Sequence, residues 1–131
     1  MSIETVRLNG RARNQLISLK RKTGIENWNI LCRWAFCVSL AERHSPRSGA
    51  VKGETGIEMT WRTFGGEYSD VYLGLLKQRC LDDGLPVEEE TLTEQLRLHL
   101  HRGIGYLAGQ KDLTSIEGLH EIVNAKSHGV D

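Results

Sequence analysis

The chain of 131 residues lacks the short motifs that mark common catalytic and metal sites. It contains no GxSxG, HExxH, GxGxxG, GxxxxGKS/T or EF-hand string. Its three cysteines, Cys32, Cys37 and Cys80, include no CxxC pair, which indicates buried, reduced thiols and not a zinc or redox site. His99 and His101 stand about 200° apart around a helix axis, so they cannot share a metal there and are expected to be packing or surface residues. We therefore expect a protein that is not an enzyme and needs no metal or other cofactor.

The sequence also lacks a secretory signal and a membrane span. Residues 1–9 are polar and alternating, without the apolar core of a signal peptide. The longest apolar run, WNILCRWAFCVSLA at residues 28–41, is shorter than the roughly 20 residues that a span needs, and Arg33 interrupts it. We expect a cytoplasmic protein that makes no contact with a membrane.

That apolar run is the segment around which the rest of the chain is organised. Eleven of its fourteen residues are apolar and none is Gly or Pro, which predicts a helix buried on most sides. Asn29 and Arg33 share one narrow polar strip on it, because they are four residues apart. A small chain is expected to need a second subunit to surround such a helix. The residues that predict a stable homo-oligomer, most simply a tetramer, are Trp28, Trp34, Phe36, Gly103 and Gly105.

The first 43 residues have the order strand, helix, glycine turn, helix. Residues 3–8 alternate like a short strand, Asn9 is a good N-cap, and Gly24 suits the left-handed residue that ends a helix. This order is typical of a ribbon-helix-helix unit, in which two chains pair their N-terminal strands and place the ribbon in the major groove of DNA. Thr5 and Arg7 would then point outward. The same order occurs in α+β domains without a DNA role, and both interpretations stay open.

The middle of the chain predicts a loop, an extended segment and a helix. Residues 44–56 are rich in Gly and Ser and form the loop. Residues 57–64 alternate like a second short strand, which can form a minor sheet with the first one. Residues 67–82 follow helical spacing.

Helical spacing returns in the last third of the chain. Thr91 and Glu94 have capping-box spacing and predict a helix from there to about Ala108, while Thr114 or Ser115 is expected to begin a last helix. The expected fold class is mainly α. We predict a single compact domain over residues 1–131, with about five helices, a ribbon-helix-helix-like N-terminal half and one or two short extended segments.

The net charge of zero hides a strong asymmetry. Residues 1–52 carry ten Lys and Arg against three acids, a net +7, and residues 53–131 carry the opposite −7. Such a division suggests one face for a polyanion. A solvated surface whose halves attract each other across subunits accounts for the charge equally well, so charge alone leaves both interpretations open.

Three stretches of the sequence resemble the DndE family of DNA sulfur modification proteins. They are NGRARNQLISLKRKTGIENWNILCRWAFCVSLAE at residues 9–42, GGEYSDVYLGLLKQRC at 65–80 and LRLHLHRGIGYL at 96–107. The resemblance implies a small subunit of the machinery that replaces a non-bridging phosphate oxygen of DNA by sulfur. It further implies work alongside a cysteine desulfurase, an iron–sulfur protein and an ATPase. In this family the smallest subunit is a DNA-binding homo-oligomer, expected to be a tetramer, associated with nicked duplex and without accepted catalytic residues.

Resemblance and charge together predict a non-catalytic subunit that binds double-stranded DNA through Lys and Arg contacts to phosphate. The predicted DNA-binding residues are Arg7, Arg11, Arg13, Lys20, Arg21, Lys22, Arg47 and Lys52. Two alternatives remain: an adaptor whose acidic half docks another DNA sulfur modification protein, and a sequence-specific ribbon-helix-helix regulator.

Overall fold

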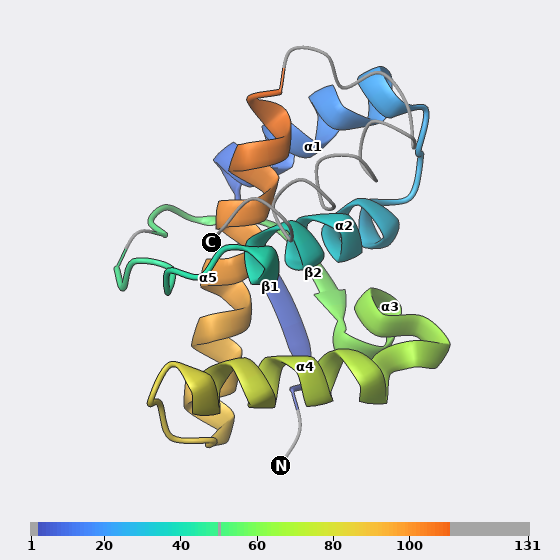
Figure 1. Cartoon of the computed structure of the whole chain (residues 1–131). Helices are drawn as coiled ribbons and strands as arrows, with labels where there is room; N and C mark the ends of the chain where they lie inside the picture. Colours follow the sequence, from blue (N-terminus) through green and yellow to red (C-terminus); the bar gives the residue numbers. More distant parts are fainter. Residues whose placement is uncertain (1–2, 50, 111–131) are drawn as a thin grey trace.

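The computed structural model describes residues 3–49 and 51–110, which form a mainly helical fold with one small sheet (Figure 1). In chain order the elements are β1 (Thr5–Asn9), α1 (Gly10–Thr23), α2 (Trp28–Ala41), β2 (Thr55–Thr60), α3 (Trp61–Gly65), the 3₁₀ turn η1 (Gly66–Tyr68), α4 (Ser69–Asp82) and α5 (Glu89–Ala108). The predicted fold class, compact and mainly α, is confirmed. None of the helices in this described part of the chain is long and apolar enough to cross a membrane.

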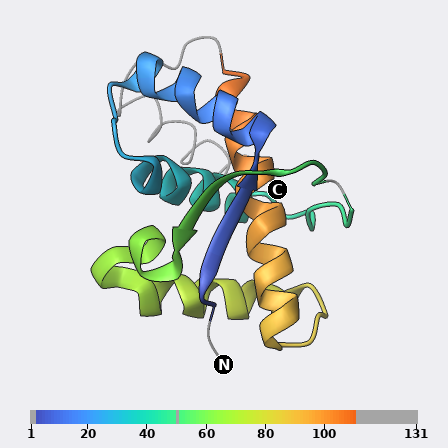
Figure 2. The same cartoon turned by 180° about the vertical axis from the view of Figure 1, so that it is seen from behind.

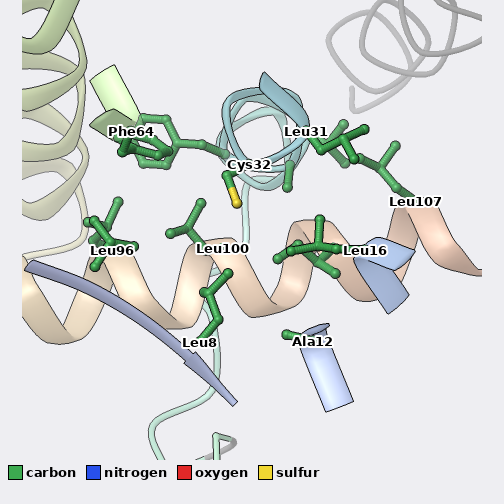
Figure 3. Close-up of a cluster of buried hydrophobic side chains, with 14 of the residues drawn as sticks. Leu8, Ala12, Leu16, Leu31, Cys32, Phe64, Leu96, Leu100 and Leu107 are labelled. Atoms are coloured by element: carbon green, nitrogen blue, oxygen red, sulfur yellow. The ribbon is translucent and has the colours of Figure 1, made fainter. Parts of the chain in front are cut away.

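Helix α5 is the axis of the fold. Helix α2 crosses one side of it at a steep angle, and β1 with the start of α1 lies on the other side (Figure 3). Helix α1 packs near the C-terminal end of α5, whereas α4 crosses its N-terminal end (Figures 1 and 2). The α1 end and the α4 end of the molecule are therefore separated by most of the length of α5.

Helix α1 begins and ends where the sequence predicts. The Asn9 side chain accepts a hydrogen bond from the Ala12 N–H at 2.9 Å, which caps the first turn. Gly24 adopts the left-handed conformation, with φ of 75°, and its N–H donates to the Lys20 carbonyl. Local signals alone fix both ends of this helix.

Helices α2 and α5 meet at a glycine. A Cβ added to Gly103 would lie 1.9 Å from the carbonyl oxygen of Ala35, so only glycine allows this approach. Phe36, fully buried, packs edge-on against Phe64, with ring centroids 5.9 Å apart. The sequence prediction that Gly103 and Phe36 point to a subunit contact is wrong, because both contacts lie within one chain.

The strand β1 pairs with β2 of the same chain, antiparallel, with Val6 opposite Met59. The predicted minor sheet is thus confirmed. The ribbon-helix-helix likeness is not confirmed, since that fold pairs the N-terminal strands of two chains. Val6 is buried, while Arg7 points outward as predicted.

The extended prediction for residues 57–64 is wrong in its second half. The Thr60 hydroxyl accepts a hydrogen bond from the Thr63 N–H and turns the chain into α3. The polar strip of α2 then holds this turn: the Asn29 amide donates to the Thr63 carbonyl at 3.1 Å, and the Arg33 guanidinium donates to the carbonyls of Thr63 and Phe64.

Helix α5 begins two residues before the predicted capping box. Its N-cap is Glu88, whose side chain makes no capping hydrogen bond, and Thr91 lies inside the first turns. The box is therefore wrong, although the acids Glu89 and Glu90 do stand in the first turn, where the helix dipole favours them. The predicted last helix, from Thr114 or Ser115, lies outside the described residues.

Candidate nucleic-acid interface

Helix α1 carries its cations on the outside. Ala12, Leu16 and Leu19 are buried, whereas Arg11 and Arg13, which flank Ala12 in the sequence, are exposed. The helix contains five Lys and Arg and no acid. Its exposed surface is therefore positive near its start, at Arg11 and Arg13, and again near its end, at Arg21.

One cavity brings three of the predicted residues together. It has a volume of about 590 Å³ and lies between the start of α1, the loop after α2 and the second half of α5. Arg11 comes from α1, while Arg47 and Lys52 come from the loop. The remaining lining residues are Asn9, Gln15, Pro46, Val51, Leu98, His101, Arg102 and Gly105. Within residues 3–49 and 51–110 no acid lines this cavity.

Asn9 joins the three elements that form the cavity. Besides capping α1, its side-chain amide donates to the Lys52 carbonyl at 2.8 Å, and its backbone N–H donates to His101 Nε2 at 3.1 Å. His101 Nδ1 then donates to the Arg97 carbonyl at 2.7 Å. Both ring nitrogens are used by the neutral form, and burial lowers the pKa of His101 below its usual value. His101 is thus a neutral part of the cavity wall.

Two arginines fix the beginning of the loop. Arg79 of α4 donates to the carbonyls of Leu40, Glu42, Arg43 and His44 at 2.7–3.2 Å. Arg102 of α5 donates to the carbonyl of Ser39 at 2.7 Å and to that of His44 at 2.6 Å. The carbonyls in the last turn of a helix lack an N–H in a following turn, so Arg79 satisfies that of Leu40, and both guanidinium groups hold the carbonyls of the first loop residues.

Sequence reasoning did not single out Asn9 as a link between elements, or His101 and Arg102 as cavity residues. No local signal marked Arg102 either, because it lies outside the apolar stripe of α5 formed by Leu92, Leu96, Leu100, Ile104 and Leu107. No local signal exists for the convergence of Asn9, His101 and Lys52, which are far apart in the chain.

The other predicted DNA-binding residues lie apart from the cavity. Arg7 pairs with Glu58 on the exposed face of the sheet, at 3.2 Å. Lys20 Nζ lies 4.1 Å above the centre of a Trp28 ring, and Lys22 Nζ donates to the Ala108 carbonyl at 3.5 Å. Arg13 and Arg21 are exposed on α1. The predicted set thus divides into a cavity group, an outward group and a group held by other parts of the chain.

Ser39, His99 and Cys32, which could serve catalysis by residue type, are buried. Ser39 Oγ accepts a hydrogen bond from Arg102 Nε at 2.8 Å and is hydrogen-bonded to His99 Nδ1 at 2.7 Å. Burial, with the charges of Arg102 and Arg79, lowers the pKa of His99 to about 3, so this ring is neutral and is the packing residue that the sequence predicts. Burial also raises the pKa of Cys32 to about 12, which keeps it a thiol.

Fold and site define a small, mainly helical protein with a basic surface and a cation-lined cavity. Across the residues that the structure describes, no three His, Cys, Asp or Glu side chains gather as metal ligands would. The chain belongs to the DndE family: the family model described as DNA sulphur modification protein DndE matches residues 5–115. It is thus a protein of DNA phosphorothioation.

Solved structures agree with this assignment. The chain is similar to the crystal structure of DndE from Escherichia coli B7A involved in DNA phosphorothioation modification, with 27% identity and a TM-score of 0.67, covering 82% of this chain and 98% of that one. A DndE G21/24K mutant involved in DNA phosphorothioation shares the fold, at 24% identity and a TM-score of 0.61, with the same coverage of each chain. No curated protein sequence matches the chain significantly.

Proposed function

We propose that this protein is a non-catalytic, DNA-binding subunit of the phosphorothioation machinery that binds duplex DNA, nicked duplex included. It acts in the cytoplasm with the other DNA sulfur modification proteins. The observation that supports this proposal is the group of exposed cations on α1 and the neighbouring loop, Arg11, Arg13, Arg21, Arg47 and Lys52, with no acid on α1 among them. Exposed cations bind the phosphates of DNA, and phosphates are the same for every base sequence. Binding to DNA is therefore expected to depend strongly on salt and only weakly on sequence.

Anisotropy titrations of labelled duplex at several salt concentrations test the proposal. Each phosphate contact removed should lower the salt slope of log K by about 0.9. The triple variant Arg11→Ala, Arg47→Ala and Lys52→Ala should bind any duplex about tenfold more weakly at moderate salt. Intact and nicked duplexes of one sequence, titrated in parallel, test whether nicks are preferred.

The matched control changes the acids at the start of α5. Glu88, Glu89 and Glu90 are exposed at the opposite end of α5 from α1, so replacing all three by Ala should leave DNA binding unchanged or slightly tighter. Unchanged affinity and salt slope in the folded cation variant would contradict direct DNA binding. A strong preference for one sequence over random duplex would favour the ribbon-helix-helix regulator instead.

The proposal includes a homo-oligomer, most simply a tetramer. Three apolar side chains at helical spacing form what we term the α4 stripe: Tyr68, Val71 and Leu75, which are 59%, 57% and 44% exposed. Covering them removes apolar surface from water, at about 25 cal/mol per Å². The α4 stripe thus supports the subunit contact in place of Phe36 and Gly103. A folded monomer in sedimentation at micromolar concentration would contradict the oligomer.

The second candidate function is an adaptor that docks another modification protein. The observation that favours it is the concentration of exposed acids beside the α4 stripe, at Glu67, Asp70 and Asp82. An acidic rim around apolar side chains suits a basic, amphipathic partner. The DNA titration above separates the two functions, because an adaptor shows no salt-dependent DNA binding of its own.

A further inference from the structure

The cavity beside α1 has two kinds of wall. Cations line one part, from Arg11, Arg47 and Lys52, and apolar residues line another, including Val51 and Leu98. A duplex presents only phosphate and sugar to such a site, because its bases are stacked and paired inside the helix. Phosphate contact would explain the cations and leave the apolar wall without a role.

The size of the cavity fits a ligand larger than a phosphate. Small-molecule sites usually enclose about 300–1,000 Å³, and this one has a volume of about 590 Å³. Sugar and base carry apolar faces that pack against side chains such as the half-buried Val51, while a phosphate carries the charge for the cations. One nucleotide unit therefore matches both the volume and the two walls.

The cavity donors have capacity for an anion. In the described part of the chain, Arg11, Arg47 and Lys52 make no ion pair, so no carboxylate competes for them. Arg102 uses Nε and one N–H on each terminal nitrogen to bind Ser39 and His44. A guanidinium has five N–H donors, so two remain on this side chain.

A glycine keeps the cavity open. A Cβ added to Gly105 would have the Gln15 side-chain nitrogen, at 4.0 Å, as its nearest neighbour, so the position has room for a side chain. Alanine would favour the helix there by about 1 kcal/mol relative to glycine. Gly105 lines the cavity, and a larger residue would fill it.

We infer that this cavity binds a single nucleotide unit, with its phosphate at Arg11, Arg47 and Lys52 and its sugar and base against the apolar wall. The unit is either a free nucleoside monophosphate or an unpaired nucleotide of a DNA strand. The inference rests on the proposed DNA-binding function and adds to it a site that prefers an unpaired nucleotide over paired duplex.

Calorimetric titration of the full chain with deoxyadenosine monophosphate, deoxyadenosine and inorganic phosphate tests the inference. The monophosphate should bind more tightly than either part alone, because only it contacts both walls. Arg11→Ala should weaken this binding about tenfold, the loss expected for one charge-assisted contact. Arg13→Ala, an exposed cation of α1 outside the cavity, should lower duplex affinity but keep mononucleotide affinity.

A second pair of variants removes the space without removing charge. Gly105→Gln should fill the cavity and weaken mononucleotide binding about tenfold or more. Gly74→Gln, at an exposed glycine of α4 with no atom within 4 Å of its added Cβ, should have no such effect. Equal mononucleotide affinity in both glycine variants would overturn the inference.

Two DNA probes distinguish the sources of the nucleotide. If the site serves a DNA strand, a duplex with one unpaired terminal nucleotide should bind more tightly than its blunt form, and Gly105→Gln should abolish the difference. If the site serves a free nucleotide, the two duplexes bind alike and only the monophosphate responds to Gly105→Gln. Blunt-duplex binding with no monophosphate binding would overturn the inference and leave the proposed function intact. If the unaltered protein binds the monophosphate but no duplex, the proposed function is overturned and the mononucleotide site is retained.

Discussion

The α1 end and the α4 end of the molecule expose opposite kinds of side chain. At the α1 end, Leu16 and Leu19 are buried and Arg11 and Arg13 are exposed. At the α4 end, the α4 stripe of Tyr68, Val71 and Leu75 is exposed, while the Arg79 side chain is only 11% exposed and binds carbonyls of α2.

The difference indicates what each end contacts. The apolar face of α1 is already covered by the rest of the chain, and the cations on its outer face suit a polyanion. The α4 end leaves apolar side chains uncovered within the chain, and such an exposed apolar surface suits contact with another protein. The two ends thus predict separable functions, and variants at one end should leave the other unchanged.

The largest effect is expected from removing Arg79, which links α4 to the end of α2 and the loop after it. Arg79→Ala leaves the Asp83 carboxylate, whose side chain is 10% exposed, without its 3.1 Å partner and frees several carbonyls of the loop. Removing one member of a buried ion pair costs about 3–5 kcal/mol. Urea denaturation should show this loss, and Lys77→Ala on the same helix should cost less than about 1 kcal/mol. If Arg79→Ala costs no more stability than Lys77→Ala, the contacts of Arg79 do not stabilise the fold.

A smaller effect is expected from changing the close contact between α2 and α5 at Gly103. Gly103→Ala brings a Cβ to 1.9 Å from the Ala35 carbonyl oxygen, so α2 and α5 must separate, at about 1–3 kcal/mol. Gly105→Ala is the matched control, since its nearest neighbour is 4.0 Å away and alanine favours the helix. Thermal unfolding should therefore move in opposite directions for the two variants. A shift in the same direction would contradict the close contact.

The next effect concerns assembly at the α4 end alone. Leu75→Glu places a charge in the α4 stripe, which is 44% exposed at this residue, and should weaken subunit association by about 1–2 kcal/mol while the fold is retained. Sedimentation across a range of concentrations measures the change, and Asn14→Glu, at an exposed position of α1, serves as the charge control. If Leu75→Glu assembles like the unaltered chain, the oligomer forms through another surface.

Local signals made part of this fold predictable. Asn9 and Gly24 act on their own neighbours, so the sequence predicts both ends of α1 correctly. The alternation of Ile57, Met59 and Trp61 continues past the end of β2, and the Thr60 cap that ends the strand competes with that pattern. A side-chain cap can override periodicity, which is why α3 was not predicted.

The candidate site was predictable only as a set of cations. Charge patterning selects Arg11, Arg47 and Lys52, because the charge of a residue follows from its type and needs no knowledge of the fold. Their meeting in one cavity depends on contacts between distant segments, such as Asn9 with His101, and no local pattern encodes these. Lys20 and Lys22 show the converse: a cation cluster in the sequence becomes a ring contact and a helix-end contact in the fold.

The smallest effect tests His99, a fully buried residue of α5 whose Nδ1 is hydrogen-bonded to Ser39 Oγ. The folded-state pKa of His99, about 3, lies below the ordinary value of 6.5, so the folded protein prefers the neutral ring. Stability is then complete above pH 6.5 and falls as the pH drops toward 3, because only the unfolded chain takes up the proton. Between pH 7 and 5.5 the loss should be about 1 kcal/mol. Urea denaturation at both pH values measures it, and His99→Gln should flatten this part of the dependence. An equal pH dependence in that variant would assign the loss to other groups, with His101 the first to examine, since burial lowers its pKa as well.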